Sequence, residues 1–95
     1  MAQVKVKLFG VFRMDTHIAE TTMEIDRLGD IFTQLNERSM ALYREKAAAD
    51  PSLAPPPQFA FKDAIVYVNG ERCARKSKRL TAADEIWLLS PASGG

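Results

Sequence analysis

The sequence has little of what metal sites, disulfides and active sites need. Its 95 residues include one cysteine and one histidine. A single cysteine cannot form an internal disulfide, and these two ligands are too few for a structural zinc site. No phosphate-binding glycine loop, zinc-ligand spacing or nucleophile elbow occurs either. We therefore expect no metal site, and no set of residues that would make the chain an enzyme by itself.

Long apolar runs and an excess of one charge are also missing. The longest apolar run covers residues 64–68, whereas a membrane helix needs about 20 apolar residues. Lys5 and Lys7 interrupt the apolar N-terminal stretch, so it does not resemble an export signal. The 13 Lys and Arg residues nearly balance the 12 Asp and Glu residues. We therefore expect a cytoplasmic protein with no nucleic-acid or membrane partner.

Hydrophobic periodicity indicates one domain made of strands and a single main helix. The length suits one domain, which we place at residues 1–90, with a tail at 91–95. After a helix N-cap at Asp26, apolar residues recur at helical spacing, and the helix ends by Asp50 because Pro51 follows. Asn69-Gly70 predicts a tight hairpin turn. Alternation predicts strands at 4–12, 18–25, 65–68, 71–74 and 85–89, with a turn at 14–16.

A proline-rich stretch separates the helix from the later strands. Residues 51–57, PSLAPPP, hold four of the five prolines, so we predict an extended surface connection at about 47–58. Phe59 and Phe61 are expected to begin the next strand. The helix has one apolar stripe and covers one face of the sheet. Because Phe9, Trp87 and Leu89 are large apolar residues for the opposite face, that face is expected to dock a partner.

Five cations gather in residues 72–79, and the sequence leaves two interpretations open. They are either a solvated hairpin or an electrostatic docking site for an acidic partner. Nucleic-acid binding fits less well, since no aromatic residues lie among them. The five are Arg72, Arg75, Lys76, Lys78 and Arg79.

Other polar residues of interest are expected to have structural roles. His17 falls in a predicted turn, and Cys73 is expected to be an inert, half-buried thiol. Asp84 is expected to accept hydrogen bonds from backbone N–H groups in a turn before the last strand, and its neighbour Glu85 to be solvated.

The sequence ends in Ser93-Gly94-Gly95, which offers a reactive group without a catalytic side chain. A terminal carboxylate is ionised at pH 7 and can attack the α-phosphorus of ATP to give an acyl adenylate. A sulfur donor can then displace AMP. Glycines have no side chains, so such a tail can thread a narrow channel in a partner. An ordinary flexible end is the alternative interpretation.

Four segments together resemble the MoaD/ThiS family of ubiquitin-like sulfur carriers. They are VKVKLFG, AIVYVNGE, LTAADEIWLLSP and the final SGG. The resemblance as a whole extends over nearly the entire chain except residues 47–61. The resemblance implies an α+β, ubiquitin-like β-grasp fold: a mixed sheet of about five strands, with the first and last strands adjacent and parallel, packed on one main helix.

The same resemblance implies a function. An E1-like enzyme would use ATP to adenylate Gly95, and a sulfurtransferase would convert it to a thiocarboxylate, with Gly94 allowing the tail to enter both partners. Phe9, Trp87, Leu89, Pro91 and Ser93 would contact partners, and no cofactor would be bound. The chain looks most like the small subunit of molybdopterin synthase, whose partner is the large subunit. Alternatives are another sulfur pathway, such as thiamine, cysteine or tRNA thiolation, and ubiquitin-like conjugation to lysines.

Overall fold

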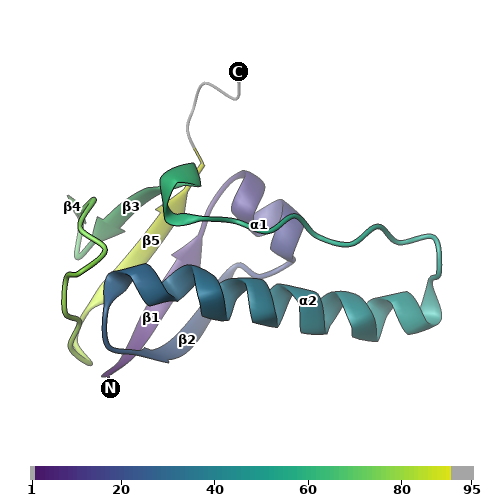
Figure 1. Ribbon diagram of the computed structural model, residues 1–95, viewed down its shortest axis with the longest axis horizontal. Helices are drawn as coiled ribbons and strands as arrows, with labels where there is room; N and C mark the ends of the chain where they lie inside the picture. The colour runs from purple at the N-terminus through teal and green to yellow at the C-terminus, as the bar shows by residue number, and fades with distance from the viewer. Residues whose placement is uncertain (1, 91–95) are drawn as a thin grey trace.

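The expected mixed sheet is present, with one long helix lying along one of its faces (Figure 1). This computed structural model describes residues 2–90. The spatial order of the strands is β2-β1-β5-β3-β4; β1 and β5 are parallel and the other neighbours are antiparallel. These features confirm the predicted β-grasp. The main elements are β1 (Ala2–Leu8), β2 (Glu20–Ile25), α2 (Ile31–Ala49), β3 (Ile65–Val68), β4 (Glu71–Arg72) and β5 (Glu85–Leu89).

The core lies between the sheet and the first half of α2. Alternate residues of the two central strands, such as Val6 and Ile86, are completely buried, and they share one core with Ile31 and Leu35 of the helix. Burial of one such side chain stabilises the fold by about 1.5–3 kcal/mol. The predicted alternation on β1 and β5 is therefore correct, and the intervening residues occupy the opposite face.

The first strand is shorter than predicted, and a short helix, α1 (Val11–Thr16), follows it. We expected a strand through residue 12 and a turn at 14–16. The chain leaves the sheet at Gly10, whose φ of +61° is in the region that favours glycine. Phe12 then packs into the core with 2% exposure. Because residue 12 continues the even-numbered alternation of the strand, periodicity alone could not distinguish the two conformations.

The helix start also differs from the prediction. A 3-10 turn, η1 (Leu28–Asp30), precedes α2, and Asp30 rather than Asp26 occupies the N-cap position. The amides of Leu28 and Gly29 donate to the carbonyls of Lys78 and Lys76, each at 2.9 Å. These N–H groups normally need a capping side chain. Here a loop from the second half of the chain satisfies them.

The proline-rich connection runs back along α2 after the helix ends at Ala49 (Figure 1). The Asn36 side chain holds it by two hydrogen bonds to Phe59: its Nδ2 donates to the carbonyl at 2.8 Å, and its Oδ1 accepts from the amide at 2.9 Å. Phe59 stacks edge-on against Phe12, with ring centroids 4.6 Å apart. The prediction that a strand starts here is wrong, because Phe59 and Phe61 cover the edge of the core. Phe61 begins a 3-10 turn, η2 (Phe61–Asp63).

The returning strand β4 is two residues long rather than four. The Cys73 amide still donates to Val66 at 2.8 Å, but the chain then leaves the sheet toward the start of α2. No helix within residues 2–90 is long and apolar enough to cross a membrane.

Candidate functional site

The open face of the sheet, opposite α2, carries a continuous row of side chains across all five strands. Lys7 lies opposite both Glu20 and Trp87, and Tyr67 lies opposite both Trp87 and Arg72. Directly opposed residues share a face of the sheet. The row therefore has an aromatic centre with a cation on each side.

The aromatic centre is a small cluster around Trp87. Its ring centroid lies 6.0 Å from that of Phe9, which meets it edge-on, and 6.4 Å from that of Tyr67. Phe9 is 39% exposed, and Leu89 pairs with Ile65 beside it. We call these five residues the aromatic patch. The structure brings together the predicted Phe9, Trp87 and Leu89 and adds Tyr67 and Ile65, which the sequence analysis did not assign to a face.

A carboxylate fixes the indole of the patch. Glu85 Oε1 accepts a hydrogen bond from Trp87 Nε1 at 2.7 Å and lies 3.3 Å from Lys7 Nζ. The hydrogen bond from Trp87, followed by that from Lys7, lowers the pKa of Glu85 below its ordinary value. Glu85 is therefore ionised at neutral pH and holds the ring in one orientation.

The turn before β5 is tied to the hairpin turn at Asn69. Asp84 Oδ2 accepts from the Thr81 amide at 2.8 Å, and Oδ1 accepts from Asn69 Nδ2 at 2.7 Å. Asn69 Oδ1 in turn accepts from the Glu85 amide at 2.9 Å. The backbone hydrogen bond from Thr81 is the largest cause of a lowered pKa at Asp84. Asp84 was predicted to accept from backbone N–H groups, and the structure shows one of them, from Thr81, together with a side-chain donor, Asn69.

Residues 72–79, which we call the basic loop, begin at the edge of the open face. Arg72 belongs to β4 and lies opposite Tyr67. The backbone of Arg79 pairs with that of Arg27 in an isolated antiparallel β-bridge. Lys76 Nζ lies 5.9 Å from the ring centroid of Phe61. Four of the five predicted cations are exposed and Lys78 is half-buried. In the part of the chain that the structure describes, none of them forms an ion pair.

Other polar residues take the structural positions expected of them. His17 is exposed and adopts a φ of +61° at the C-terminal end of α1. Cys73 is half-buried against the core. Among residues 2–90, no group of three or more His, Cys, Asp or Glu side chains is placed to hold a metal ion.

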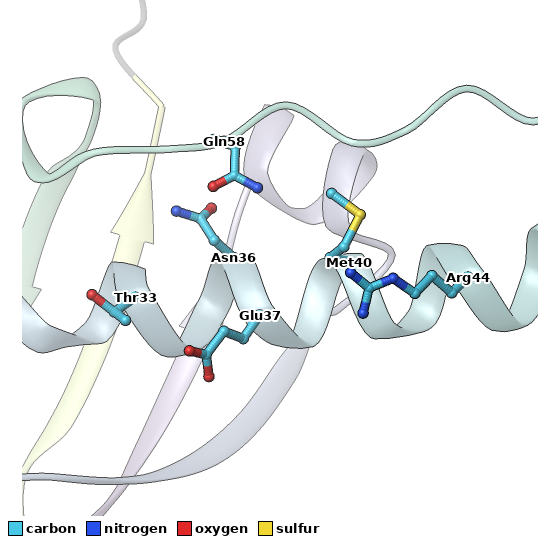
Figure 2. Close-up of a pocket in the computed structure, with 6 residues that line it drawn as sticks. All are labelled: Thr33, Asn36, Glu37, Met40, Arg44 and Gln58. Carbon is cyan, nitrogen blue, oxygen red and sulfur yellow. The ribbon is translucent and has the colours of Figure 1, made fainter.

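A hollow lies between α2 and the proline-rich connection, away from the residues predicted from the sequence. Figure 2 shows Gln58 of the connection pointing toward Asn36 of the helix, with Met40 and Arg44 further along. Because Asn36 already binds the Phe59 backbone, this amide holds the connection in place. The predicted tail residues Pro91, Ser93, Gly94 and Gly95 lie outside the described part of the chain.

Several solved structures match the chain over nearly its full length. The small archaeal modifier protein 1 of Methanosarcina acetivorans is 26% identical, with a TM-score of 0.70 and coverage of 100% of this chain and 98% of that one. A putative molybdopterin converting factor subunit 1 from Pyrococcus furiosus is 22% identical, with a TM-score of 0.65 and coverage of 97% and 100%.

A third match comes from a complex. In the complex of subunits 1 and 2 of the Helicobacter pylori molybdopterin-converting factor, the matching chain is 19% identical, with a TM-score of 0.50 and coverage of 98% and 99%. No protein-family model matches the chain, and neither does any curated protein. The structural matches confirm the ubiquitin-like fold and the resemblance to MoaD-like proteins.

Proposed function

We propose that this MoaD/ThiS-like, ubiquitin-like protein is a sulfur carrier whose reactive group is the carboxylate of Gly95. The observation that carries the proposal is the match to a putative molybdopterin converting factor subunit 1, which covers 97% of this chain with a TM-score of 0.65. The sequence motifs resembling the sulfur carriers support it, because they cover both the central strands and the Gly94-Gly95 end.

In the proposed reaction the chain is a co-substrate of other enzymes. A carboxylate oxygen of Gly95 attacks the α-phosphorus of ATP within an E1-like enzyme, and pyrophosphate leaves. Hydrosulfide supplied by a sulfurtransferase then attacks the acyl carbon, the bond between that carbon and the AMP oxygen breaks, AMP leaves, and the terminus is a thiocarboxylate. The partner enzymes bind the folded domain while the tail reacts, and the aromatic patch is the surface that they contact.

We assign the sulfur to molybdopterin synthesis, with the chain as the small subunit of the synthase. The fold shared with a putative converting factor subunit 1 supports this pathway. The Helicobacter pylori complex, in which subunit 1 is bound to subunit 2, supports a large-subunit partner of that kind. The aromatic patch would supply the contact, since exposed aromatic residues are frequent anchors of protein interfaces.

Conjugation to lysine side chains is the second candidate function. It is favoured by one observation, the match to a protein named as a small archaeal modifier. Both functions would begin with the same adenylate and differ in the nucleophile: a sulfur donor in one and a lysine amine in the other.

Intact-mass measurement tests the proposal. The full chain is incubated with the E1-like enzyme of its own genome, ATP and a sulfur donor, and a chain lacking Gly94 and Gly95 is the matched control. We expect an AMP adduct and then an oxygen-to-sulfur exchange on the full chain only. Absence of both would refute the carrier function, while Gly-Gly remnants on lysines in cell digests would support conjugation.

A further inference from the structure

The basic loop concentrates the positive charge of an otherwise acidic chain. Residues 71–79, which are the basic loop and the Glu71 before it, hold five of the 13 Lys and Arg residues and one of the 12 Asp and Glu residues. This segment therefore carries a charge of +4, and the remainder of the chain carries −3. Such a segregated charge produces a local field that the net charge of +1 conceals.

The loop is held in place by its backbone rather than by its side chains. Its carbonyls at Lys76 and Lys78 accept the amides of Gly29 and Leu28, and the amide of the following Leu80 donates to Asp26, each at 2.9 Å. The sequence alone left a solvated hairpin as one interpretation. The structure shows that the backbone of the loop is fastened to the start of the main helix, while four of its five cations are exposed. Little ordering of the backbone is therefore needed when the loop binds a partner.

Gly29 makes this attachment possible. A Cβ placed at position 29 would lie 3.0 Å from the Cβ of Lys76 and 3.2 Å from its carbonyl oxygen. These distances are shorter than ordinary van der Waals contacts, so a side chain here would require the loop to shift by a few tenths of an ångström. The glycine therefore sets the position from which the cations are presented.

The charges of the loop are engaged only weakly within the described fold: Lys76 Nζ lies 5.9 Å from the centroid of the Phe61 ring, and the charge of Lys78 is one of the smaller causes of the lowered pKa of Asp84. No ion pair involving them forms in residues 2–90, and the bridge between Arg79 and Arg27 adds another cation beside them. Like charges on directly paired residues of two neighbouring segments repel one another. None of these cations has a carboxylate in an ion pair within the described residues, so they are available to pair with carboxylates of another molecule.

We propose that the basic loop docks a cluster of carboxylates on the partner protein that also covers the aromatic patch. This inference rests on the proposed function, since it concerns the proteins that act on Gly95. Arg72 joins the two surfaces, because it is on β4 directly opposite Tyr67 of the patch. The partner is an acidic protein surface with an adjoining apolar pocket, so that one interface covers both regions.

A protein suits this surface better than a nucleic acid does. The basic loop itself contains no aromatic side chain on which a base could stack. The remaining charge of −3 would repel an extended polyanion that ran beyond the loop. A protein carboxylate cluster needs only the limited area that the loop offers.

The test compares two double charge reversals in the full chain. Arg75→Glu with Arg79→Glu reverses two exposed cations of the loop, and Arg44→Glu with Lys46→Glu reverses two exposed cations of α2 as a matched control. Association with the E1-like enzyme and with the synthase large subunit of the same genome is measured without ATP. Circular dichroism and thermal melting verify that both variants are folded.

We expect the loop variant to associate roughly tenfold or more slowly, and the control nearly as fast as the unaltered chain. The difference should shrink when ionic strength rises from about 0.1 M to about 1 M, because the Debye length falls from about 10 Å to about 3 Å. Gly29→Ala should reduce association without any change of charge. Equal rates for the two double variants would overturn the inference.

Three further outcomes are decisive. Failure of the unaltered chain to bind either protein would overturn the inference, as would tighter binding to a DNA duplex than to both proteins. In the third outcome the loop variant binds more slowly, but the unaltered chain shows no AMP adduct and no sulfur exchange. This result would support the docking site and refute the proposed sulfur chemistry.

Discussion

The two faces of the sheet are formed by the same strands, yet one face builds the core and the other is open to solvent. On the covered face Val6, Ile86 and Leu88 are completely buried against α2. On the open face, their neighbours Lys7 and Trp87 form a row that meets solvent. Because side chains alternate along a strand, one short sequence specifies both a core and a docking surface. Adjacent residues should therefore respond to mutation in different ways.

The largest effect is expected on the covered face. Leu88 has an exposed fraction of 0%, so Leu88→Ala would leave a cavity and lower the free energy of unfolding by about 2–5 kcal/mol. Urea denaturation monitored by circular dichroism measures this change. A loss no larger than that of Trp87→Ala would show that the two faces do not differ as the structure indicates.

On the open face the effect should fall on binding rather than on folding. Trp87→Ala is expected to weaken partner affinity by about 1–3 kcal/mol, the range for aromatic interface anchors, with Phe9→Ala acting in the same direction. Calorimetry with the synthase large subunit provides the measurement. Thr33→Ala, on the exposed side of α2, is the control. Equal affinities for Trp87→Ala and this control would contradict the assignment of the patch.

Much of this contrast could be predicted from the sequence, because alternation is a local signal. The residues Val4, Val6 and Leu8, and likewise Ile86 and Leu88, are buried as the pattern indicates. The Asn69-Gly70 turn also follows from local chemistry, and both residues have the expected positive φ, at 54° and 85°. Strand order itself came from the family resemblance rather than from periodicity.

The features that sequence reasoning missed depend on contacts between distant segments. The helix start is capped by carbonyls of Lys76 and Lys78, so the nearby Asp26 was the wrong choice. Phe59 is held by Asn36, and no local pattern indicates such a pair. The attachment of the basic loop to Gly29 also joins segments that are far apart in the sequence, so no local pattern predicted it. Gly29 in the first helical turn is its one trace in the sequence, because glycine is unfavourable inside a helix.

An intermediate effect is expected at the turn that leads into β5. Asp84→Ala removes the acceptor of the Thr81 amide and of Asn69, and should lower the free energy of unfolding by about 1–2 kcal/mol. Asp84→Asn retains an acceptor oxygen and should lower the free energy of unfolding by a smaller amount than Asp84→Ala does. Urea denaturation at neutral pH compares the two, and a larger loss for asparagine would contradict this role.

The same carboxylate predicts a pH dependence. Mainly because of the Thr81 hydrogen bond, the folded pKa of Asp84 lies below its ordinary value of 3.8. The stabilisation is therefore complete above that value and is lost as pH falls through the lowered folded pKa. Stability measured across this acid range should decline less steeply in Asp84→Ala than in the unaltered chain. Parallel curves would count against the assignment.

The smallest effect is expected where the open face orders its own aromatic residue. Trp87 is the single tryptophan of the chain, so its fluorescence reports on this position alone. Glu85→Ala removes the acceptor of the indole N–H, found at 2.7 Å, and should shift the emission maximum and lower the anisotropy with little change in stability. Glu85→Gln keeps an acceptor oxygen but loses the ion pair with Lys7, so its spectrum should stay near that of the unaltered chain. Identical spectra for all three proteins would mean that ring packing against Phe9 and Tyr67, rather than the carboxylate, fixes the indole.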